Sequence, residues 1–319
     1  DFKNGWKQYQ WRWECEDFPS ENRPFPQPIW NGSNLSGKPI LVWAEQGIGD
    51  EIMFASMLND LMQMNANIMV ECEHRLVSLF QRSFPDIQFS SRKNPPHQQL
   101  LNPDIHYQIS MGSLGQWLRP TQDSFKRNQT YYLTACPERV SKLRNKYQQL
   151  ANGKQLVGIS WKSTDINRRR AKSKSTLLEY WKLVLSQPDC YFINLQYGDV
   201  ESELAQFESE TSLKIYRDQE IDPLVNLDDF AAQISVLDLV ISTSNTTVHM
   251  AGALGKRVWT LLPCIPDWRW MLDREEALWY PTMRLFRQSR IGDWQDVFQQ
   301  VRVTLPKYCS NFKIRIKEA

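Results

Sequence analysis

The sequence of 319 residues lacks the features that mark membrane proteins and proteins that bind polyanions. No apolar run approaches the roughly 18 residues that a membrane helix needs, and we expect neither a membrane span nor a signal peptide. The charges nearly cancel, with 38 Lys and Arg against 36 Asp and Glu, so no net field draws the chain onto nucleic acid. Any site for an anion must therefore be local.

Cysteine and histidine are also sparse. The six cysteines are scattered without a C-x-x-C pair, which argues against a zinc ribbon or a disulfide scaffold and favours a reducing compartment. The four histidines lie far apart, and the sequence contains no Asp-x-Asp pair. We therefore predict no metal site and a metal-independent activity.

The first thirty residues differ from the rest of the chain. The chain begins at Asp1 rather than at methionine, so we expect it to be a fragment of a longer protein. Phe2, Trp6, Tyr9 and Trp13 stand at helical spacing, which predicts a helix with an aromatic face. A proline-rich segment follows, and we place a domain boundary near Trp30.

From residue 39 onward, apolar strand patterns alternate with helical patterns, which is typical of an α/β fold. The first half predicts strands at 39–45, 67–71, 87–89 and 106–109, and helices at 51–64 and 75–83. A helix predicted at 137–150 ends this half. The second half predicts helices at 177–186, 229–236 and 294–303, and strands at 156–161, 191–196, 213–216 and within 237–263. We expect two Rossmann-like domains, 30–152 and 153–319, facing each other across a cleft, with residues 1–29 as a helical segment and linker.

Residues 237–263, which we call the clasp, predict a buried strand, a tight loop, a small-residue helix at 246–254 and a second strand. Ser244 or Asn245 is placed to cap the helix, and Gly255 to end it. Ser242, Thr243, Thr246 and Thr247 add hydroxyl groups beside a helix start, where a phosphate binds well. The alternative is an ordinary βαβ unit in a buried core. Residues 245–247 also form a glycosylation sequon, but a sugar there would block the clasp, which favours the cytosol.

Basic residues follow the strand that ends at Trp161. Lys162 comes directly after this strand, where its side chain can meet a phosphate as a point charge. Residues 168–174 are mostly a solvated charged loop in our interpretation, with Lys174 as the exception. His249 lies one turn into the clasp helix, where it is either a buried core residue or a ligand of the same phosphate.

The glycine turn Gln46-Gly47-Ile48-Gly49-Asp50 lets the backbone bend tightly beside a ligand, although a G-x-G without a third glycine is a weak dinucleotide signal. Asp50 is placed to cap the next helix. Alternatively, its carboxylate serves as the general base that takes a proton from an acceptor hydroxyl, with Glu45 as the second candidate.

Together these segments resemble a known family. The motifs WAEQGIGDEIMFA at 43–55, SNTTVHMAGALG at 244–255, PDWRW at 266–270 and WYP at 279–281 resemble the glycosyltransferase domain that follows tetratricopeptide repeats in many bacterial proteins. That domain is related to the heptosyltransferases and to O-linked N-acetylglucosamine transferase. The resemblance covers nearly the whole chain from residue 30, and residues 5–13 resemble the end of a last repeat.

The resemblance implies a GT-B fold, with a nucleotide-sugar donor held mainly by the C-terminal domain and no cofactor beyond this co-substrate. It implies metal-independent transfer with inversion, and a base role for Asp50. It also implies that Gln196 and its neighbours approach the base or ribose, and that Trp268 belongs to the loops of the cleft. The chain departs from the family at Ser244, where an aspartate is common, and at Trp161-Lys162-Ser163, where Trp-x-Gly is commoner.

The favoured hypothesis is a bacterial, cytoplasmic glycosyltransferase that moves a sugar from a nucleotide donor to a hydroxyl, on a protein presented by upstream repeats. The donor would contact Lys162, Lys174, Gln196, Ser244, Asn245, Thr246, Thr247 and His249. One alternative is a module of the same fold that binds a nucleotide sugar or a protein without turnover. Another is a nucleotide-sugar epimerase.

Overall fold

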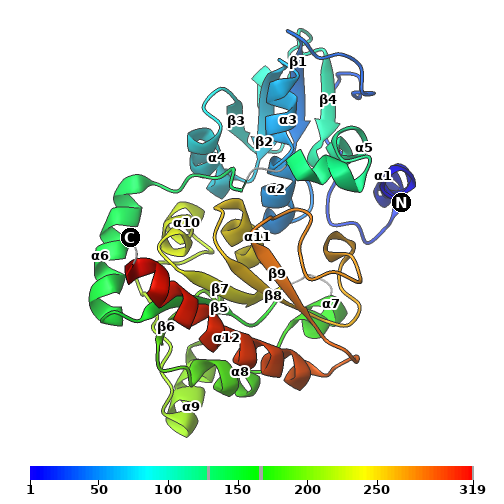
Figure 1. Ribbon diagram of the computed structural model, residues 1–319. Coiled ribbons are helices and arrows are strands. Elements are labelled where there is room, and N and C mark those ends of the chain that lie inside the picture. The colour runs from blue at the N-terminus through cyan, green and yellow to red at the C-terminus, as the bar shows by residue number, and fades with distance from the viewer. Residues whose placement is uncertain (128–129, 165–167, 318–319) are drawn as a thin grey trace. The chain divides into compact units, whose positions relative to one another are not determined.

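A computed structural model of the chain describes residues 1–127, 130–164 and 168–317. The chain divides into two compact units, residues 1–134 and 135–319 (Figure 1). Each unit is built on a parallel sheet, so the expected α/β class with two Rossmann-like units is confirmed. Among the described residues, no helix is long and apolar enough to cross a membrane.

The sheet of the first unit contains, in its described part, four strands in the order β3-β2-β1-β4, all parallel. The strands are β1 (Pro39–Trp43), β2 (Asn67–Cys72), β3 (Gln88–Ser91) and β4 (Tyr107–Ser110). The helices are α1 (Phe2–Tyr9), α2 (Ile48–Ala55), α3 (Leu58–Gln63), α4 (Val77–Ser83) and α5 (Gly115–Leu118). Short 3-10 helices are η1 (Gln10–Glu14), η2 (His74–Leu76), η3 (Gln98–Leu101), η4 (Met111–Leu114) and η5 (Gln122–Arg127).

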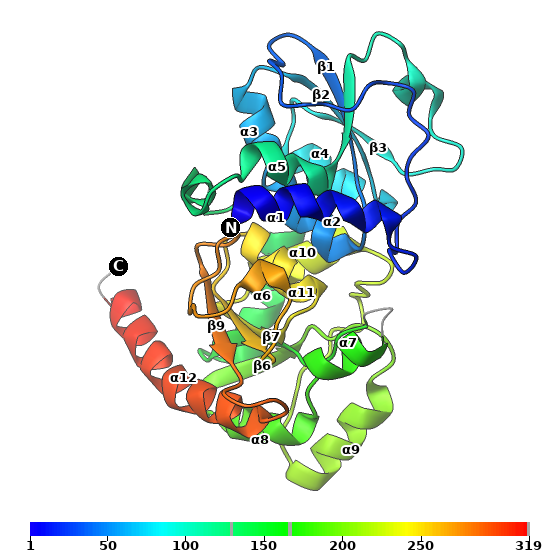
Figure 2. The same ribbon diagram turned by 90° about the vertical axis from the view of Figure 1, so that its right-hand side faces the viewer.

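The first eighteen residues pack onto this unit rather than standing apart from it. Trp6 is buried, its indole N–H donates to the Arg119 carbonyl oxygen at 2.8 Å, and its ring fills the space beside Gly115. The aromatic stripe therefore finds its partner in α5 and η4, and α1 lies along α5 in Figure 2.

The second unit carries, in its described part, five parallel strands in the order β6-β5-β7-β8-β9. The strands are β5 (Gln155–Ser160), β6 (Cys190–Asn194), β7 (Leu239–Thr243), β8 (Val258–Leu262) and β9 (Met283–Arg287). The helices are α6 (Pro137–Ala151), α7 (Arg168–Lys174), α8 (Leu178–Leu185), α9 (Glu201–Thr211), α10 (Leu227–Ser235), α11 (Thr246–Ala253) and α12 (Trp294–Lys317), with the 3-10 helix η6 (Trp268–Trp270). All residues of β5, β7 and β8 are buried, as expected for a parallel sheet covered on both faces.

Several predicted elements differ from the structure. The helix predicted at 51–64 is two helices, α2 and α3. Because α2 begins at Ile48, its N-cap is Gly47, and Asp50 lies inside the first turn, where its carboxylate accepts from the Gly47 N–H. The strand predicted at 213–216 is reduced to an isolated bridge between Tyr216 and Ile193. The predicted loop at 168–174 contains α7, and α12 extends well beyond residue 303.

The prediction also assigned α6 to the first domain, whereas the structure divides the chain between Thr134 and Ala135. The reason is packing, because α6 lies against β5 and α10 of the second sheet. In the same unit, α12 and α8 run side by side in both views (Figures 1 and 2).

Candidate functional site

The order of strands in the second sheet reverses beside β5, because β6 lies on one side of it and β7 on the other. At such a reversal the connections leave in opposite directions and open a crevice at the carboxyl ends of the two strands. Ser160 and Ser242 are paired across β5 and β7, so the residues that follow them meet at this edge. These are Trp161 and Lys162 on one side, and Ser244 and Asn245 on the other.

Asn245 holds this edge together with both ends of its amide. Its side-chain oxygen accepts from the Thr247 N–H at 3.0 Å and thus caps α11, so of the two predicted caps, Ser244 and Asn245, the structure has Asn245. Its amide nitrogen donates to the Ser160 hydroxyl at 2.7 Å and to the Lys162 carbonyl oxygen at 3.0 Å. The start of α11 is therefore tied to the end of β5.

The start of α11 has the properties of an anion site. The first N–H groups of a helix have no acceptor inside it, and the helix dipole places positive charge there. Thr246 is half-buried at the first helical position, and the buried hydroxyl oxygens of Thr243 and Thr247 have no hydrogen-bond partner in the structure. At its other end, Gly255 adopts the left-handed conformation, with a φ of 70°, and ends the helix as predicted.

Two aromatic residues hold the polar side chains next to this helix start. The Trp270 indole N–H donates to the Ser244 hydroxyl at 2.8 Å, and its ring stacks on His249 at 5.4 Å between centroids. The Tyr280 hydroxyl lies 2.9 Å from His249 Nδ1. His249 is buried. It is therefore a core residue, as one of the two predictions for it stated, and it also lies beside the candidate anion site.

Charged residues surround His249. Burial lowers its pKa well below the usual range, and the nearby cations Arg269 and Lys174 lower it further. Burial alone would raise the pKa of Asp267, but Arg269 and Lys174 outweigh it and bring that pKa to about 2. At neutral pH the imidazole is thus uncharged and the Asp267 carboxylate ionised, with Lys174 close to both. Trp268, at the start of η6, is 41% exposed.

Lys162 is turned toward another partner. Its ammonium nitrogen lies 2.5 Å from a Glu203 carboxylate oxygen on α9, which also accepts from the Trp161 indole N–H at 3.3 Å. This pair is partly exposed to solvent. The point charge that the sequence predicts is present beside the crevice, but Glu203 balances it.

Gln196 connects the crevice to a pocket. Its side-chain oxygen accepts from the Ser160 hydroxyl at 3.0 Å and from the backbone N–H groups of Trp161 and Lys162 at 2.9 and 2.7 Å. It is also one of the residues that line a pocket of about 410 Å³ at the carboxyl end of β6. A continuous chain of hydrogen bonds therefore runs from Asn245 through Ser160 to Gln196.

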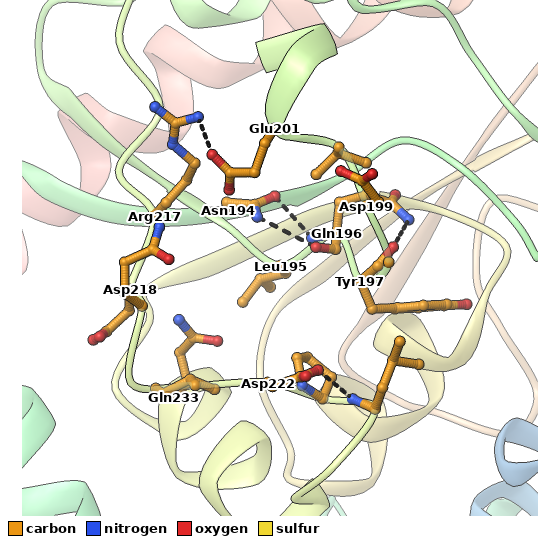
Figure 3. Close-up of a pocket in the computed structure, with 16 residues that line it drawn as sticks. Asn194, Leu195, Gln196, Tyr197, Asp199, Glu201, Arg217, Asp218, Asp222 and Gln233 are labelled. Atoms are coloured by element: carbon orange, nitrogen blue, oxygen red, sulfur yellow. Dashed lines mark hydrogen bonds and ion pairs between the residues drawn. The ribbon is translucent and has the colours of Figure 1, made fainter. Parts of the chain in front are cut away.

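The pocket is polar and carries more carboxylates than cations. Figure 3 shows Arg217 paired with Glu201 on one side, at 2.9 Å, and Asp222 and Gln233 on another. The Asp218 carboxylate is held in place by α6, because the Tyr147 hydroxyl and the Lys146 ammonium group of that helix donate to it at 2.8 and 2.9 Å. The pocket offers many acceptors for sugar hydroxyls or base N–H groups. Its other lining residues include Asn194, Tyr197 and Asp199.

In the first unit, the strand order reverses between β1 and β4, and the glycine turn follows β1 at this reversal. The turn is held from within and by the preceding segment. The Asp50 carboxylate accepts from the Gly47 N–H at 3.2 Å, and Gln46, which has a φ of 63°, donates its N–H to the Ser20 hydroxyl. Gly47 is exposed, Ile48 and Asp50 are half-buried, and Gly49 is buried.

The equivalent crevice of the first unit is filled by the chain itself. Arg12 of η1 reaches the ends of β1 and β4, where its guanidinium lies 2.9 Å from a Glu45 carboxylate oxygen and also donates to Ser110 and Ser113. Glu45 has no exposed surface, and a Cβ at Gly112 would lie 2.0 Å from its carboxylate. Glu45 is therefore enclosed by a buried ion pair, which does not fit the catalytic role considered for it.

The fold is similar to those of solved glycosyltransferase structures. One neighbour is a family 9 glycosyl transferase from Veillonella parvula, with 12% identity and a TM-score of 0.62 over 88% of this chain and 100% of that one. Another is the E. coli ADP-heptose LPS heptosyltransferase II, with 13% identity and a TM-score of 0.60 over 85% and 99% of the two chains. The fold is that of the GT-B glycosyltransferases.

In sequence, the chain is similar to the protein FlbA of Caulobacter vibrioides, with 32% identity over 320 residues. The match covers 96% of this chain but only 53% of FlbA, so the chain spans about half of that relative. No family model matches the chain. The glycosyltransferase fold is thus established by the structure, while the sequence relative carries no activity over to it.

In this glycosyltransferase fold, the predicted donor residues of the second unit come together only in part. Ser244, Asn245, Thr246, Thr247 and His249 gather at the start of α11, with Lys174 near His249. Gln196 joins them through Ser160, whereas Lys162 faces Glu203.

Sequence reasoning missed several residues of the site, namely Trp270, Tyr280, Glu203, Arg217 and Asp218. The aromatic motifs after residue 263, which contain Trp270 and Tyr280, were recognised in the sequence, but no function was predicted for these two residues. Glu203 and Asp218 carried no signal, because a carboxylate in a polar segment resembles any solvated one. Among the described residues, no group of three His, Cys, Asp or Glu side chains could hold a metal ion.

Proposed function

We propose that the chain is a glycosyltransferase that moves a sugar from a nucleotide-sugar donor to a hydroxyl group. The observation that carries this proposal is the hydrogen-bonded line from Asn245 through Ser160 to Gln196, which joins an anion-binding helix start to a polar pocket. A nucleoside diphosphate needs these two features side by side, the helix start for its phosphates and the pocket for its nucleoside. They lie at the strand reversal, where open α/β sheets bind ligands.

In this proposal the nucleoside occupies the 410 Å³ pocket, where carboxylates accept from its hydroxyl and amino groups. The diphosphate extends to the start of α11 and meets the backbone N–H groups and the hydroxyls of Thr246 and Thr247. Lys174 and Lys162 supply positive charge at its sides, and Lys162 exchanges Glu203 for the phosphate when the donor binds.

The chemistry follows from charge. The bond between the sugar C1 and the phosphate oxygen breaks as the acceptor oxygen attacks C1 from the opposite face, which inverts the configuration. Negative charge then develops on the departing nucleotide, and the fixed dipoles of α11 with nearby cations stabilise it without a metal. Asp50 takes the proton of the acceptor hydroxyl. We assign this role to Asp50 rather than to Glu45, which is buried against Arg12.

We propose a protein hydroxyl as the acceptor, following the resemblance to domains that follow tetratricopeptide repeats. For the donor we propose an adenine nucleotide as the first candidate, because one structural neighbour is named for ADP-heptose. The localisation that we propose is the cytoplasm.

Isothermal titration of the chain with ADP, GDP, UDP and CMP tests the donor site. We expect one of them to bind, and Lys174→Ala and Thr247→Val to weaken that binding more than Lys142→Ala, an exposed substitution on α6. Absence of binding by all four nucleotides would contradict the proposal. The matching nucleotide sugars are then followed for nucleotide release, which Asp50→Asn should abolish if Asp50 is the base.

Two observations favour a second candidate, a binding module without turnover. Ser244 replaces the aspartate that is common in the resembling family, and Lys162 is already neutralised by Glu203. This candidate predicts nucleotide binding without release in the presence of peptide and sugar acceptors. Conversion of the donor without any acceptor would instead indicate an epimerase.

A further inference from the structure

His249 is held on two sides by residues that the proposed function does not use. Tyr280 contacts Nδ1, and Trp270 covers one face of the ring. Both come from the aromatic segment after β8, while His249 itself lies on α11. The three side chains are buried, so their mutual geometry is set by packing and not by solvent.

The direction of the hydrogen bond between Tyr280 and His249 is linked to the tautomer of the imidazole. A phenol hydroxyl can donate its one proton or accept at its oxygen. A neutral imidazole has one N–H and one bare nitrogen. If the Tyr280 hydroxyl donates to Nδ1, then Nδ1 is the bare nitrogen and the ring proton is on Nε2.

The backbone of α11 is shaped to admit this contact. A Cβ at Gly252 would lie 2.5 Å from the Tyr280 ring, so only glycine lets the ring lie against the helix. Trp270 adds a second constraint, because its indole N–H is bound to the Ser244 hydroxyl at 2.8 Å while its ring stacks on the imidazole. The imidazole is thus fixed in both rotation and position next to the residue that precedes the helix cap.

We infer that Tyr280 and Trp270 are positioning residues for His249. They fix its ring so that Nε2–H donates a hydrogen bond to a phosphate of a nucleoside diphosphate. An uncharged N–H donor recognises a phosphate oxygen as a backbone N–H does. The inference rests on the proposed donor site, but the state of the ring is a property of the chain without ligand.

The charged and titratable groups facing His249 are Arg269, Asp267 and Lys174, besides Tyr280. The two cations disfavour an imidazolium and Asp267 favours it, and burial disfavours it most. We therefore expect the ring to stay uncharged through neutral pH, so nucleotide binding should not follow a histidine titration between pH 6 and pH 8.

The tautomer is measured directly by NMR of the ¹⁵N-histidine-labelled chain without ligand, with His249→Gln to assign the signal. We expect the wild-type chain to show the Nε2–H tautomer, and Tyr280→Phe to show a mixture. A wild-type ring protonated on Nδ1 would overturn the inference whether or not the chain binds nucleotides.

The consequence for binding is measured with ADP, or with GDP or UDP if one of these binds better. Loss of one fixed hydrogen bond should weaken binding by about threefold to tenfold in Tyr280→Phe. Tyr308→Phe is the matched control, because it also removes a tyrosine hydroxyl of this unit, which donates to the Asp238 carbonyl oxygen at 2.9 Å. It should lower the melting temperature without weakening nucleotide binding.

A second experiment, in the His249→Gln variant, distinguishes positioning of His249 from a purely structural role of Tyr280. Glutamine at position 249 keeps a side-chain N–H donor that does not depend on a tautomer, so in His249→Gln the further change Tyr280→Phe should leave the Kd unchanged. Equal weakening in both backgrounds, or no weakening of the wild type by Tyr280→Phe, would refute the positioning role. If no nucleotide binds the wild type, the proposed function fails, and the tautomer measurement still decides the state of His249.

Discussion

At the scale of single residues, the amide of Asn245 performs two tasks with two atoms. The oxygen caps α11, and the nitrogen ties the helix start to Ser160 and to the Lys162 carbonyl oxygen. Aspartate has the same shape and caps a helix equally well, but it has no N–H and adds a negative charge.

We predict that Asn245→Asp weakens nucleotide binding at least tenfold, because a carboxylate then faces the phosphate. Asn245→Ala, which removes the cap, should cost about 1 kcal/mol or more of stability. Titration calorimetry and denaturant unfolding measure the two effects. If the Asn245→Asp variant bound nucleotide as tightly as the wild type, the proposed position of the phosphate at the start of α11 would be contradicted.

Arg12 is the second residue with a defined task, since it neutralises Glu45 in the interior of the first unit. Arg12→Ala leaves a buried carboxylate without its cation, and such changes destabilise by about 3–5 kcal/mol. Lys142→Ala, which breaks an exposed pair with Glu220, should cost less than about 1 kcal/mol. Addition of Glu45→Gln to Arg12→Ala should restore part of the loss in urea unfolding. Little loss in Arg12→Ala would return Glu45 to the list of candidate bases.

At the scale of elements, α11 depends on a glycine in its interior. Gly252→Ala would normally favour a helix by about 0.5–1 kcal/mol, but here the new methyl group meets the Tyr280 ring. We predict a net loss of about 1–3 kcal/mol, typical of overpacking. Gly5→Ala is the control, because nothing lies within 4 Å of a Cβ at that position of α1, and it should be neutral or stabilising. Thermal unfolding of both variants compares the two helices.

The first turn of α2 carries a carboxylate whose proton affinity depends on folding. Burial raises the pKa of Glu51 from 4.5 to about 8, although Arg92 and the Glu73 N–H oppose the rise. The folded state therefore binds a proton that the unfolded state has released, and this contribution to stability is lost as pH rises from about 4.5 to about 8.

We predict that the free energy of unfolding of the wild type declines across this pH range and that Glu51→Gln, which cannot titrate, flattens the decline. Denaturant midpoints at pH 5, 6, 7 and 8 make the comparison. Parallel curves for the two proteins would show that Glu51 is ionised throughout.

Much of the element order could be predicted from the sequence, because buried parallel strands are short apolar runs that need no tertiary information. The cap at Asn245 and the stop at Gly255 were also predictable, since both follow from local hydrogen bonds and backbone conformation. The missed elements had the opposite character. Helix α9 is rich in glutamate and β9 contains two arginines, so neither shows the period of its secondary structure.

At the scale of the whole molecule, the near balance of charge and the scarcity of metal ligands bear on the chemistry. The described residues contain no cluster of three metal-ligating side chains, and the proposed transfer uses fixed dipoles and lysines to stabilise the leaving nucleotide. We predict that 5 to 10 mM EDTA, on the order used to strip divalent ions, leaves nucleotide release unchanged within about twofold. Restoration of a lost rate by added Mg²⁺ would contradict this mechanism.

The two units use the same edge of their sheets differently. In the second unit the strand reversal opens toward a polar pocket, whereas in the first unit Arg12 and Glu45 fill it. The glycine turn of the first unit still presents Asp50, which stays the proposed base.

The sequence by itself determined the α/β class, the two sheets and the capped helix of the clasp, because these follow from apolar period, turn residues and helix caps close together in the chain. Tertiary structure alone decided that Glu45 is closed off by a residue 33 positions away, that Lys162 faces Glu203 and that Tyr280 binds His249. Such pairs depend on which strand ends meet in space. A single sequence carries no local signal for that, because any carboxylate or aromatic residue could serve as the partner.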